Sequence, residues 1–422
     1  MAREIVIYLV VHQPRRLKLP AQPIPRGARP PDIERCLFDE RLNERYFRKV
    51  SQRCYWPTVR LLTELVGQGL HLAIGFSVSF LRQAERWDPA LLQAFQGLVR
   101  QPQVELVGVE PYHSFLPLVD LGAFSDRMVW MRQHLAALFG RSVRVTDTTE
   151  MCMSDPIAHA LSVAGFQAGL MDGREWVLGW RQPTYLYRHG RLRLFTRHYQ
   201  LSDDVGYRFS DRRWPGWPLD ADRYADWLTW AAGEVVVLGW DFETFGEHHA
   251  AETGIFEFLR YLVRAVQARG GRFVTPSAYL DTHPEGGYDL PLPAFASTWA
   301  GSGGMEFFLG NAAQQALFQL MLAVYHKARL TGDPALLDLA LWLLQSDNLH
   351  LIQWFGRSGP EAEVSAYFTP REWWELGPNG IISEQQRVYQ NFLGALEYYL
   401  PDQPPIPPDG SLPEPLAERV FG

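Results

Sequence analysis

The sequence predicts an α/β protein in which parallel strands close into a barrel that is followed by a helical region. Two observations support this fold. Short apolar runs rich in β-branched residues alternate with amphipathic segments as far as residue 281. Polar motifs follow several of these runs, and the carboxyl ends of strands are where a parallel barrel carries its functional residues.

The first apolar run, residues 5–11, is too short to cross a bilayer and has no cleavage site nearby. We therefore predict that it is a first buried strand, and no later stretch resembles a membrane span. Further strands are predicted at 71–78, 104–109, 143–147, 168–171, 192–198, 234–240 and 272–275. Amphipathic patterns at 42–67 and 124–139 predict two of the intervening helices.

The character of the sequence changes after residue 281. Prolines and a glycine-rich stretch at 301–304 predict a linking loop over 282–309. Helical patterns at 310–330, 334–354 and 383–399 predict a helical region over 310–400 that contributes to the active-site cleft. The predicted organisation is thus a catalytic barrel over 1–281, this loop, the helical region and a proline-rich tail over 401–422.

The composition narrows the class of ligand and the compartment. The chain has 40 basic and 47 acidic residues and no basic block, which argues against nucleic acid and favours a neutral or weakly polar ligand. Cys36, Cys54 and Cys152 form no CxxC pair and make a poor disulfide framework, so we predict a cytoplasmic protein. No glycine-rich phosphate loop is present, and we expect no cofactor and no membrane partner.

Two acidic clusters follow predicted strands, Asp-Thr-Thr-Glu at 147–150 and Asp-Phe-Glu-Thr-Phe-Gly-Glu at 241–247. Carboxylates at the ends of two buried strands can face one cleft, as glycosidic bond cleavage requires. Glu150 is then a candidate nucleophile, although a solvated loop glutamate is the alternative. Asp241 follows a very apolar strand, and burial would raise its pKa as a general acid requires.

Three other residues are candidates for sugar contacts. His12 closes the first strand and His113 follows the third, where each imidazole could bind a sugar hydroxyl or be a satisfied structural histidine. Asp347 lies inside an apolar helical pattern, where a charge needs a partner or a cleft. It is either a ligand contact or a salt-bridged core residue.

These motifs, taken in order, carry a resemblance to a known family. They are His12-Gln13-Pro14, then Gly108 to Ser114 (Gly-Val-Glu-Pro-Tyr-His-Ser), Thr149-Glu150, Trp240 to His248 (Trp-Asp-Phe-Glu-Thr-Phe-Gly-Glu-His) and Ser346-Asp347. Together they resemble the five ordered sequence regions of glycoside hydrolase family 57, and the α-amylase group most of all. The region around Asp241 is the most specific of the five.

The resemblance implies an incomplete (β/α)7 barrel, a helical region and retaining cleavage or transfer of α-glucosidic bonds in α-1,4-glucans or maltooligosaccharides. It makes Glu150 the nucleophile and Asp241 the acid/base, with no metal. The residues predicted to bind substrate are His12, Gln13, Glu110, His113, Trp240, Glu243, His248 and Asp347. Met151-Cys152-Met153 and Asn348-Leu349-His350 depart from the pattern of the α-amylase group and leave the chain-length preference open.

Two other hypotheses stay open from the sequence. A metal-dependent polysaccharide deacetylase would bind a divalent cation through His12, Asp241, His248 and His249, although no histidine pair has HxH or HxxxH spacing. A non-catalytic glucan-binding protein could share the same fold. The presence of both Glu150 and Asp241 argues against the second hypothesis.

Overall fold

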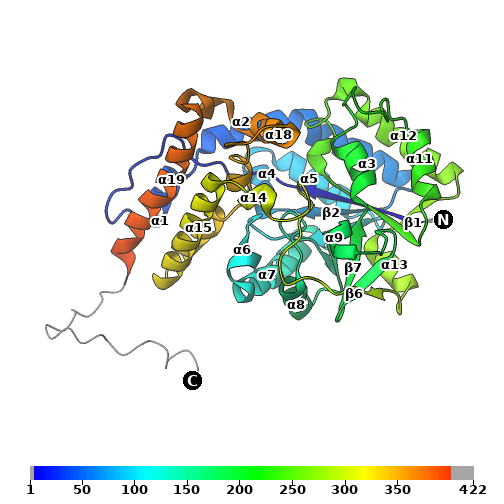
Figure 1. Cartoon of the computed structure of the whole chain (residues 1–422), viewed down its shortest axis with the longest axis horizontal. Helices are drawn as coiled ribbons and strands as arrows, with labels where there is room; N and C mark the ends of the chain where they lie inside the picture. Colours follow the sequence, from blue (N-terminus) through cyan, green and yellow to red (C-terminus); the bar gives the residue numbers. More distant parts are fainter. Residues whose placement is uncertain (1–3, 401–422) are drawn as a thin grey trace.

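The computed structural model describes residues 4–400 and contains one barrel flanked by helices (Figure 1). Seven parallel strands follow one another in the order β8-β1-β2-β3-β4-β5-β7. Their bounds are β1 Glu4–Val11, β2 Leu72–Phe76, β3 Val104–Gly108, β4 Val145–Thr146, β5 Ala168–Asp172, β7 Leu192–Arg197 and β8 Val235–Asp241. The predicted parallel barrel of seven strands is therefore confirmed.

The barrel closes where β7 meets β8, and this seam is short. β1 and β8 are paired from Glu4 with Val235 to Val10 with Asp241. In contrast, β7 and β8 share one registered pair, Arg197 with Val237. The seam therefore has the fewest registered pairs in the ring, which agrees with the expectation of an incomplete barrel.

Three short strands lie outside the ring. β6 (Leu186–His189) is antiparallel to β7, and β10 (Tyr288–Asp289) extends the sheet beyond β6. Neither was predicted, because each is too short to give a periodic pattern. β9 (Arg272–Phe273) pairs with the start of β1, and the predicted strand at 143–147 is reduced to β4.

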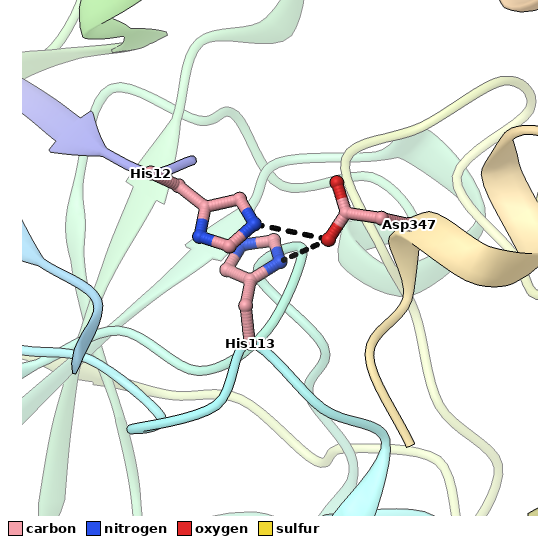
Figure 2. Close-up of side chains that lie close together, drawn as sticks. All are labelled: His12, His113 and Asp347. Atoms are coloured by element: carbon pink, nitrogen blue, oxygen red, sulfur yellow. Dashed lines mark hydrogen bonds and ion pairs between the residues drawn. The ribbon is translucent and has the colours of Figure 1, made fainter. Parts of the chain in front are cut away.

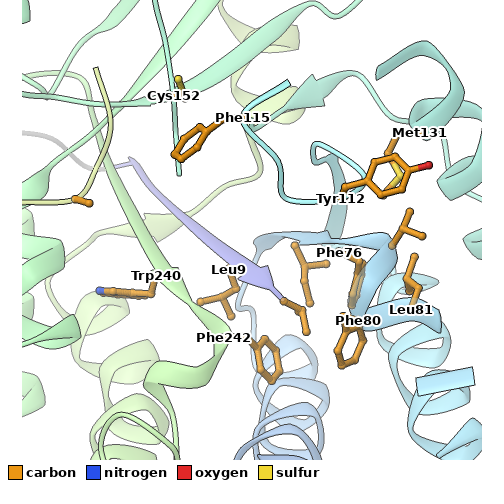
Figure 3. Packing of buried hydrophobic residues seen from close by; sticks show 14 of the residues in the cluster. Leu9, Phe76, Phe80, Leu81, Tyr112, Phe115, Met131, Cys152, Trp240 and Phe242 are labelled. Atoms are coloured by element: carbon orange, nitrogen blue, oxygen red, sulfur yellow. The ribbon is translucent and has the colours of Figure 1, made fainter. Parts of the chain in front are cut away.

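The barrel strands are buried on both faces, which explains why they are continuously apolar rather than alternating. In β1, Val6, Tyr8 and Val10 point into the barrel interior, where they join residues such as Val107 and Val145. The alternate residues of β1 face the surrounding helices. Figure 3 shows part of this outer layer, where Leu9 lies beside Trp240 and Phe242.

The helices before residue 283 cover the outside of the barrel, except α1, which packs against the helices that follow the barrel. The helices before residue 283 are α1 Pro30–Leu37, α2 Glu40–Val50, α3 Trp56–Gly67, α4 Val78–Trp87, α5 Pro89–Val99, α6 Leu116–Val119, α7 Leu121–Phe139, α8 Asp155–Val163, α9 Glu175–Leu178, α10 Tyr199–Gly206, α11 Ala221–Trp230, α12 Ile255–Ala268 and α13 Pro276–Thr282. The pattern at 42–67 corresponds to α2 and α3, which a π-helical turn (η1, Ser51–Tyr55) joins. Within residues 4–400, none of the helices combines the length and apolarity that a membrane span needs.

The helices after the barrel pack as a separate group on one side (Figure 1). They are α14 Glu306–Leu309, α15 Ala312–Leu330, α16 Pro334–Leu343, α17 Asp347–His350, α18 Pro360–Phe368 and α19 Gly377–Leu396, with α15 lying against α19. The predicted tail over 401–422 lies outside the described residues. All three cysteines are free, as expected.

One helix prediction was wrong. The pattern at 334–354 predicted a continuous helix, but α16 ends at Leu343 and α17 begins at Asp347. The intervening backbone bonds to the turn after β3 instead: the Phe115 amide donates to the Leu344 carbonyl at 3.1 Å, and the Ser346 amide donates to the His113 carbonyl at 3.0 Å. This break ties the helical region to the mouth of the barrel.

Candidate active site

The carboxyl ends of the strands bring four predicted site residues together with Asp347. His12 follows β1, His113 follows β3, Glu150 follows β4 and Asp241 ends β8. Because Asp241 pairs with Val10 on the neighbouring strand, it lies beside the chain that leads to His12. Asp347 reaches the same place from α17 of the helical region.

Glu150 lies on a strained turn. Its φ is 57° and that of Met151 is 50°, in the left-handed region that residues other than glycine rarely adopt. The loop over 290–304 holds this turn: the Trp299 amide donates to the Glu150 carbonyl at 3.1 Å, and Met153 and Ser297 exchange two main-chain hydrogen bonds. Ser154 then caps α8. The strain fixes the direction of the Glu150 side chain.

Two donors bind the Glu150 carboxylate. The Trp299 indole donates to Oε2 at 2.6 Å, and the Ser346 hydroxyl donates to Oε1 at 2.9 Å. The side chain remains 13% exposed. Glu150 is therefore not a solvated loop glutamate, because a loop and the helical region hold its two oxygens from different directions.

His113 supports the same carboxylate through Ser346. Its Nδ1 lies 3.0 Å from Ser346 Oγ and 3.8 Å from Glu150 Oε1. Ser346 donates its single hydroxyl proton to Glu150, so its oxygen must accept the hydrogen bond with His113. We therefore assign the neutral tautomer of His113 in which Nδ1 carries the proton. Burial lowers the pKa of His113 to about 3, with a further contribution from His12. His113 is therefore neutral at physiological pH.

His12 and Asp347 form a second pair at the site. Figure 2 shows the two imidazole rings stacked beside the Asp347 carboxylate, with ring centroids 4.0 Å apart. His12 Nε2 lies 2.9 Å from Asp347 Oδ2, and its Nδ1 lies 2.8 Å from the Ser77 hydroxyl. Burial opposes ionisation of Asp347, but His12, His113 and His350 together outweigh it and hold the pKa of this carboxyl below its usual range. Asp347 is thus a partly exposed residue at the start of α17 whose carboxylate bonds His12, rather than a residue in the middle of a helix.

Asp241 differs from Glu150 in its surroundings. Among residues 4–400, no donor forms a hydrogen bond with its carboxylate. Burial raises its pKa to about 6, while His12 and Arg197 act in the opposite direction. Burial also raises the pKa of Glu150 to about 8, against the hydrogen bond from Trp299. Both carboxyl groups therefore hold a proton more strongly than a solvated carboxyl group does, and the charge of Asp241 adds to the raised pKa of Glu150.

Three predicted site residues are buried, and their polar groups form hydrogen bonds with other residues of the protein. Glu110 is fully buried, and its Oε2 accepts from the amides of Tyr112 and Ser114, so it shapes the turn that carries His113. Gln13 donates to the Tyr55 hydroxyl at 2.9 Å, and that hydroxyl donates to Glu243.

Trp240 and His248 also lie away from the paired histidines. The Trp240 indole is 2% exposed and donates to the Ser202 carbonyl at 2.7 Å. The half-buried ring of His248 lies 5.3 Å from that of Phe368, measured between centroids. Neither residue is part of the cluster that Figure 2 shows.

Within residues 4–400, the four residues of the hypothetical deacetylase site do not form a cluster that could hold a metal ion. The two ring nitrogens of His249 lie within hydrogen-bond distance of the Ser210 hydroxyl and the Gly206 carbonyl. A different set, His12, His113 and Asp347, places three possible ligand atoms within 4.8 Å of one another. In that set His12 Nε2 already bonds Asp347, and His113 Nδ1 bonds Ser346. Both nitrogens would have to exchange these partners to coordinate a cation.

Sequence reasoning missed several residues of the site. Trp299 and Ser77 have no local pattern that distinguishes them from other loop residues. Ser346 stood next to Asp347 in a recognised motif, but its role depends on the break between α16 and α17. Arg197 ends an apolar strand, which is a signal of the kind that identified Asp241.

Comparison with known proteins identifies the family. The model of glycosyl hydrolase family 57 matches residues 6–291, which include His12, His113, Glu150 and Asp241. A relative named "Putative alpha-amylase", from Methanocaldococcus jannaschii, is 36% identical over 289 residues, which are 67% of this chain and 61% of the relative. The chain thus matches about three-fifths of the length of that relative.

Solved structures share the fold at low sequence identity. The 4-alpha-glucanotransferase from Thermococcus litoralis superimposes with a TM-score of 0.67 at 16% identity, over 96% of this chain and 61% of that chain. The GH57-type branching enzyme from Pyrococcus horikoshii gives a TM-score of 0.64 at 16% identity, over 99% of this chain and all of that chain. These enzymes therefore share the barrel with its helical region. Since the family model also matches the strands that carry the site, this chain belongs to glycosyl hydrolase family 57.

Proposed function

We propose that the protein is a retaining glycoside hydrolase or transglycosylase that acts on α-1,4-glucans. The observation that carries the proposal is the Glu150 carboxylate, which a strained turn and two donors aim at the mouth of the barrel. The family and the named activities of its relatives support an α-glucan as substrate. The paired histidines and Asp347 supply polar groups for the sugar that is cleaved.

The proposed reaction has two displacements. Asp241 protonates the leaving glycosidic oxygen while Glu150 attacks the anomeric carbon, which forms a glucosyl-enzyme ester. Asp241, now ionised, then removes a proton from water or from a sugar hydroxyl, which attacks the ester and releases Glu150. The anomeric configuration is inverted twice and so is retained.

The mechanism requires the proton on Asp241 before the first step. Glu150 accepts hydrogen bonds from an indole and a hydroxyl, and both favour its ionised form. Asp241 has no such donor among the described residues. We therefore place the proton on Asp241 and the negative charge on Glu150, although burial raises the pKa of Glu150 further than that of Asp241.

The product pattern tests this function. Incubation with one defined maltooligosaccharide should give shorter α-configured products if water is the acceptor, and additional products longer than the substrate if a sugar is the acceptor. Proton NMR at the earliest time points distinguishes the α-anomer from the β-anomer. A first product in the β-configuration would contradict double displacement, and an absence of turnover would favour a glucan-binding protein.

Asp347 provides a test of the sugar-binding role. Asp347→Asn keeps the size of the side chain but removes the charge, so contacts that strengthen as the sugar ring distorts should weaken. We expect kcat/KM to fall by about 10- to 100-fold, as for loss of a charged hydrogen bond, with little change in melting temperature.

The control for Asp347→Asn is Asp281→Asn, which removes the exposed ion pair with Arg144. Such a pair contributes little to stability, and we expect unchanged kinetics. If Asp347→Asn alters only the melting temperature, the residue is a structural partner of His12 and the sugar contact is wrong.

A further inference from the structure

Arg197 ends β7 beside the seam of the barrel, and each of its three side-chain nitrogens has an acceptor. Its side chain is 3% exposed. Nε donates to the Gly239 carbonyl at 2.9 Å, Nη1 to Asp172 at 3.0 Å and Nη2 to Asp203 at 2.6 Å. A guanidinium whose three nitrogens all bind different acceptors has one orientation.

The bond to Gly239 fixes the strand that ends in Asp241. Arg197 and Val237 form the single registered pair between β7 and β8. Beyond this pair, toward the active site, the Arg197 side chain replaces main-chain pairing as the link between β7 and β8. It binds the carbonyl of Gly239, two residues before Asp241. The contact is close, since a Cβ on Gly239 would lie 3.2 Å from Arg197 Cδ. β8 stays paired with β1 as far as Asp241, and Arg197 holds its other side, where the pairing with β7 has ended.

The same residue reaches Glu150 through Trp299. The guanidinium carbon of Arg197 lies 5.6 Å from the centroid of the Trp299 ring, at cation–π distance. Asp172, which binds Arg197, also binds Arg174, and Arg174 donates to the Trp299 carbonyl at 2.8 Å. Trp299 is thus held by the ionic network Arg174–Asp172–Arg197–Asp203: Arg197 lies against its ring, and Arg174 binds its carbonyl. The indole nitrogen of the same residue donates to Glu150.

On the basis of the proposed function, we propose that Arg197 is a positioning residue that aligns both carboxylates, Asp241 through the Gly239 carbonyl and Glu150 through Trp299. The network spans the seam between β7 and β8, where a single registered pair joins the strands, so it adds a second connection between the two groups on this side of the ring. Displacement of reacting groups by about 1 Å can cost about 100-fold in rate.

Arg197→Lys tests the alignment. Lysine keeps the positive charge between Asp172 and Asp203, but one ammonium group cannot replace a fork that binds three acceptors in different directions. We expect kcat/KM to fall by about 10- to 100-fold, with most of the loss in kcat because the sugar contacts are unchanged. Arg269→Lys is the control, since Arg269 also binds two carboxylates and a carbonyl, between α11 and α12, away from the site.

A second readout does not depend on turnover. Infrared difference spectra between each protein and its Asp241→Asn counterpart follow the ionisation of Asp241. The positive charge of Arg197 lowers the pKa of Asp241, alongside the effect of His12 and against that of Asp347. Arg197→Gln should therefore raise the pKa of Asp241. If this shift occurs in a protein that does not act on glucans, the proposed function fails while the link between Arg197 and Asp241 stands.

The link to Glu150 is tested by combining Arg197→Lys with Trp299→Phe, which keeps the ring and removes the donor. If Arg197 acts through Trp299, the two losses in kcat/KM should be clearly less than multiplicative. Full activity of Arg197→Lys would overturn the proposal. A loss of activity that only parallels a lowered melting temperature, with an unchanged titration of Asp241 in Arg197→Gln, would also overturn it.

Discussion

Glu150→Gln should lower kcat/KM by about 10⁴-fold or more, as expected when the nucleophile of a covalent mechanism is removed. The amide oxygen can still accept from the Trp299 indole, and the amide nitrogen would then donate to the Ser346 hydroxyl, which reverses that hydrogen bond. The main-chain hydrogen bonds that hold the strained turn do not involve the side chain, so the turn should persist. The amide cannot attack the anomeric carbon. Initial rates on a maltooligosaccharide, together with the melting temperature, check this expectation.

Glu105→Gln is a matched control for Glu150→Gln. Glu105 is also a buried carboxylate with a pKa raised by burial, but it lies in the first half of β3 and accepts hydrogen bonds from Ser277 at the opposite end of the barrel. We expect it to retain activity. Near wild-type activity of Glu150→Gln would contradict the assignment of the nucleophile.

Azide gives a stereochemical test of the same residue. In Glu150→Ala the missing side chain leaves room for the anion, which can attack an activated aryl α-glucoside from the face that Glu150 occupies. One displacement would then give a β-glucosyl azide. An α-glucosyl azide from this variant would place the nucleophile elsewhere.

The sequence predicted the barrel because its strands are buried on both faces. Continuous apolar runs such as 234–240 could not be confused with solvent-exposed segments, and the polar residue that ended each run was a candidate for the site. Asp241 and His12 were found in this way. Short strands such as β4, β6 and β10 have too few residues to give a period.

The partners of Glu150 could not be predicted from local sequence. Trp299 lies 149 positions away and Ser346 lies 196 positions away. Each donates through its side chain and is positioned by main-chain hydrogen bonds. Trp299 comes from a loop, and Ser346 comes from the break between two helices. Binary patterns describe which face of an element is buried, but they do not encode where a loop crosses a barrel.

For the same reason, the motif residues Glu110 and Glu243 were difficult to interpret. A carboxylate next to a catalytic motif could face the cleft or point into the protein. Both point inward, toward backbone amides in one case and the Tyr55 hydroxyl in the other. Their acidic character supports the turns that carry the exposed residues.

Asp241→Asn should have an effect that depends on the leaving group. A maltooligosaccharide leaves as a poor, strongly basic alkoxide and needs protonation, so kcat/KM should fall by about 10²- to 10⁴-fold. The phenolate of an activated aryl α-glucoside leaves without a proton, so kcat/KM for that substrate should change much less. Its second step should become slow, because no base remains to deprotonate water, and the glucosyl-enzyme should accumulate in a burst.

The pH dependence provides a further test of the acid. In the wild type, kcat/KM should fall as pH rises through the pKa of Asp241, because the first step needs its protonated form and burial raises this pKa to about 6 in the empty site. Asparagine does not titrate, so this descending limb should disappear in Asp241→Asn. Equal losses on both substrates with the limb unchanged would mean that another group donates the proton and that Asp241 only binds the sugar or shapes the end of β8.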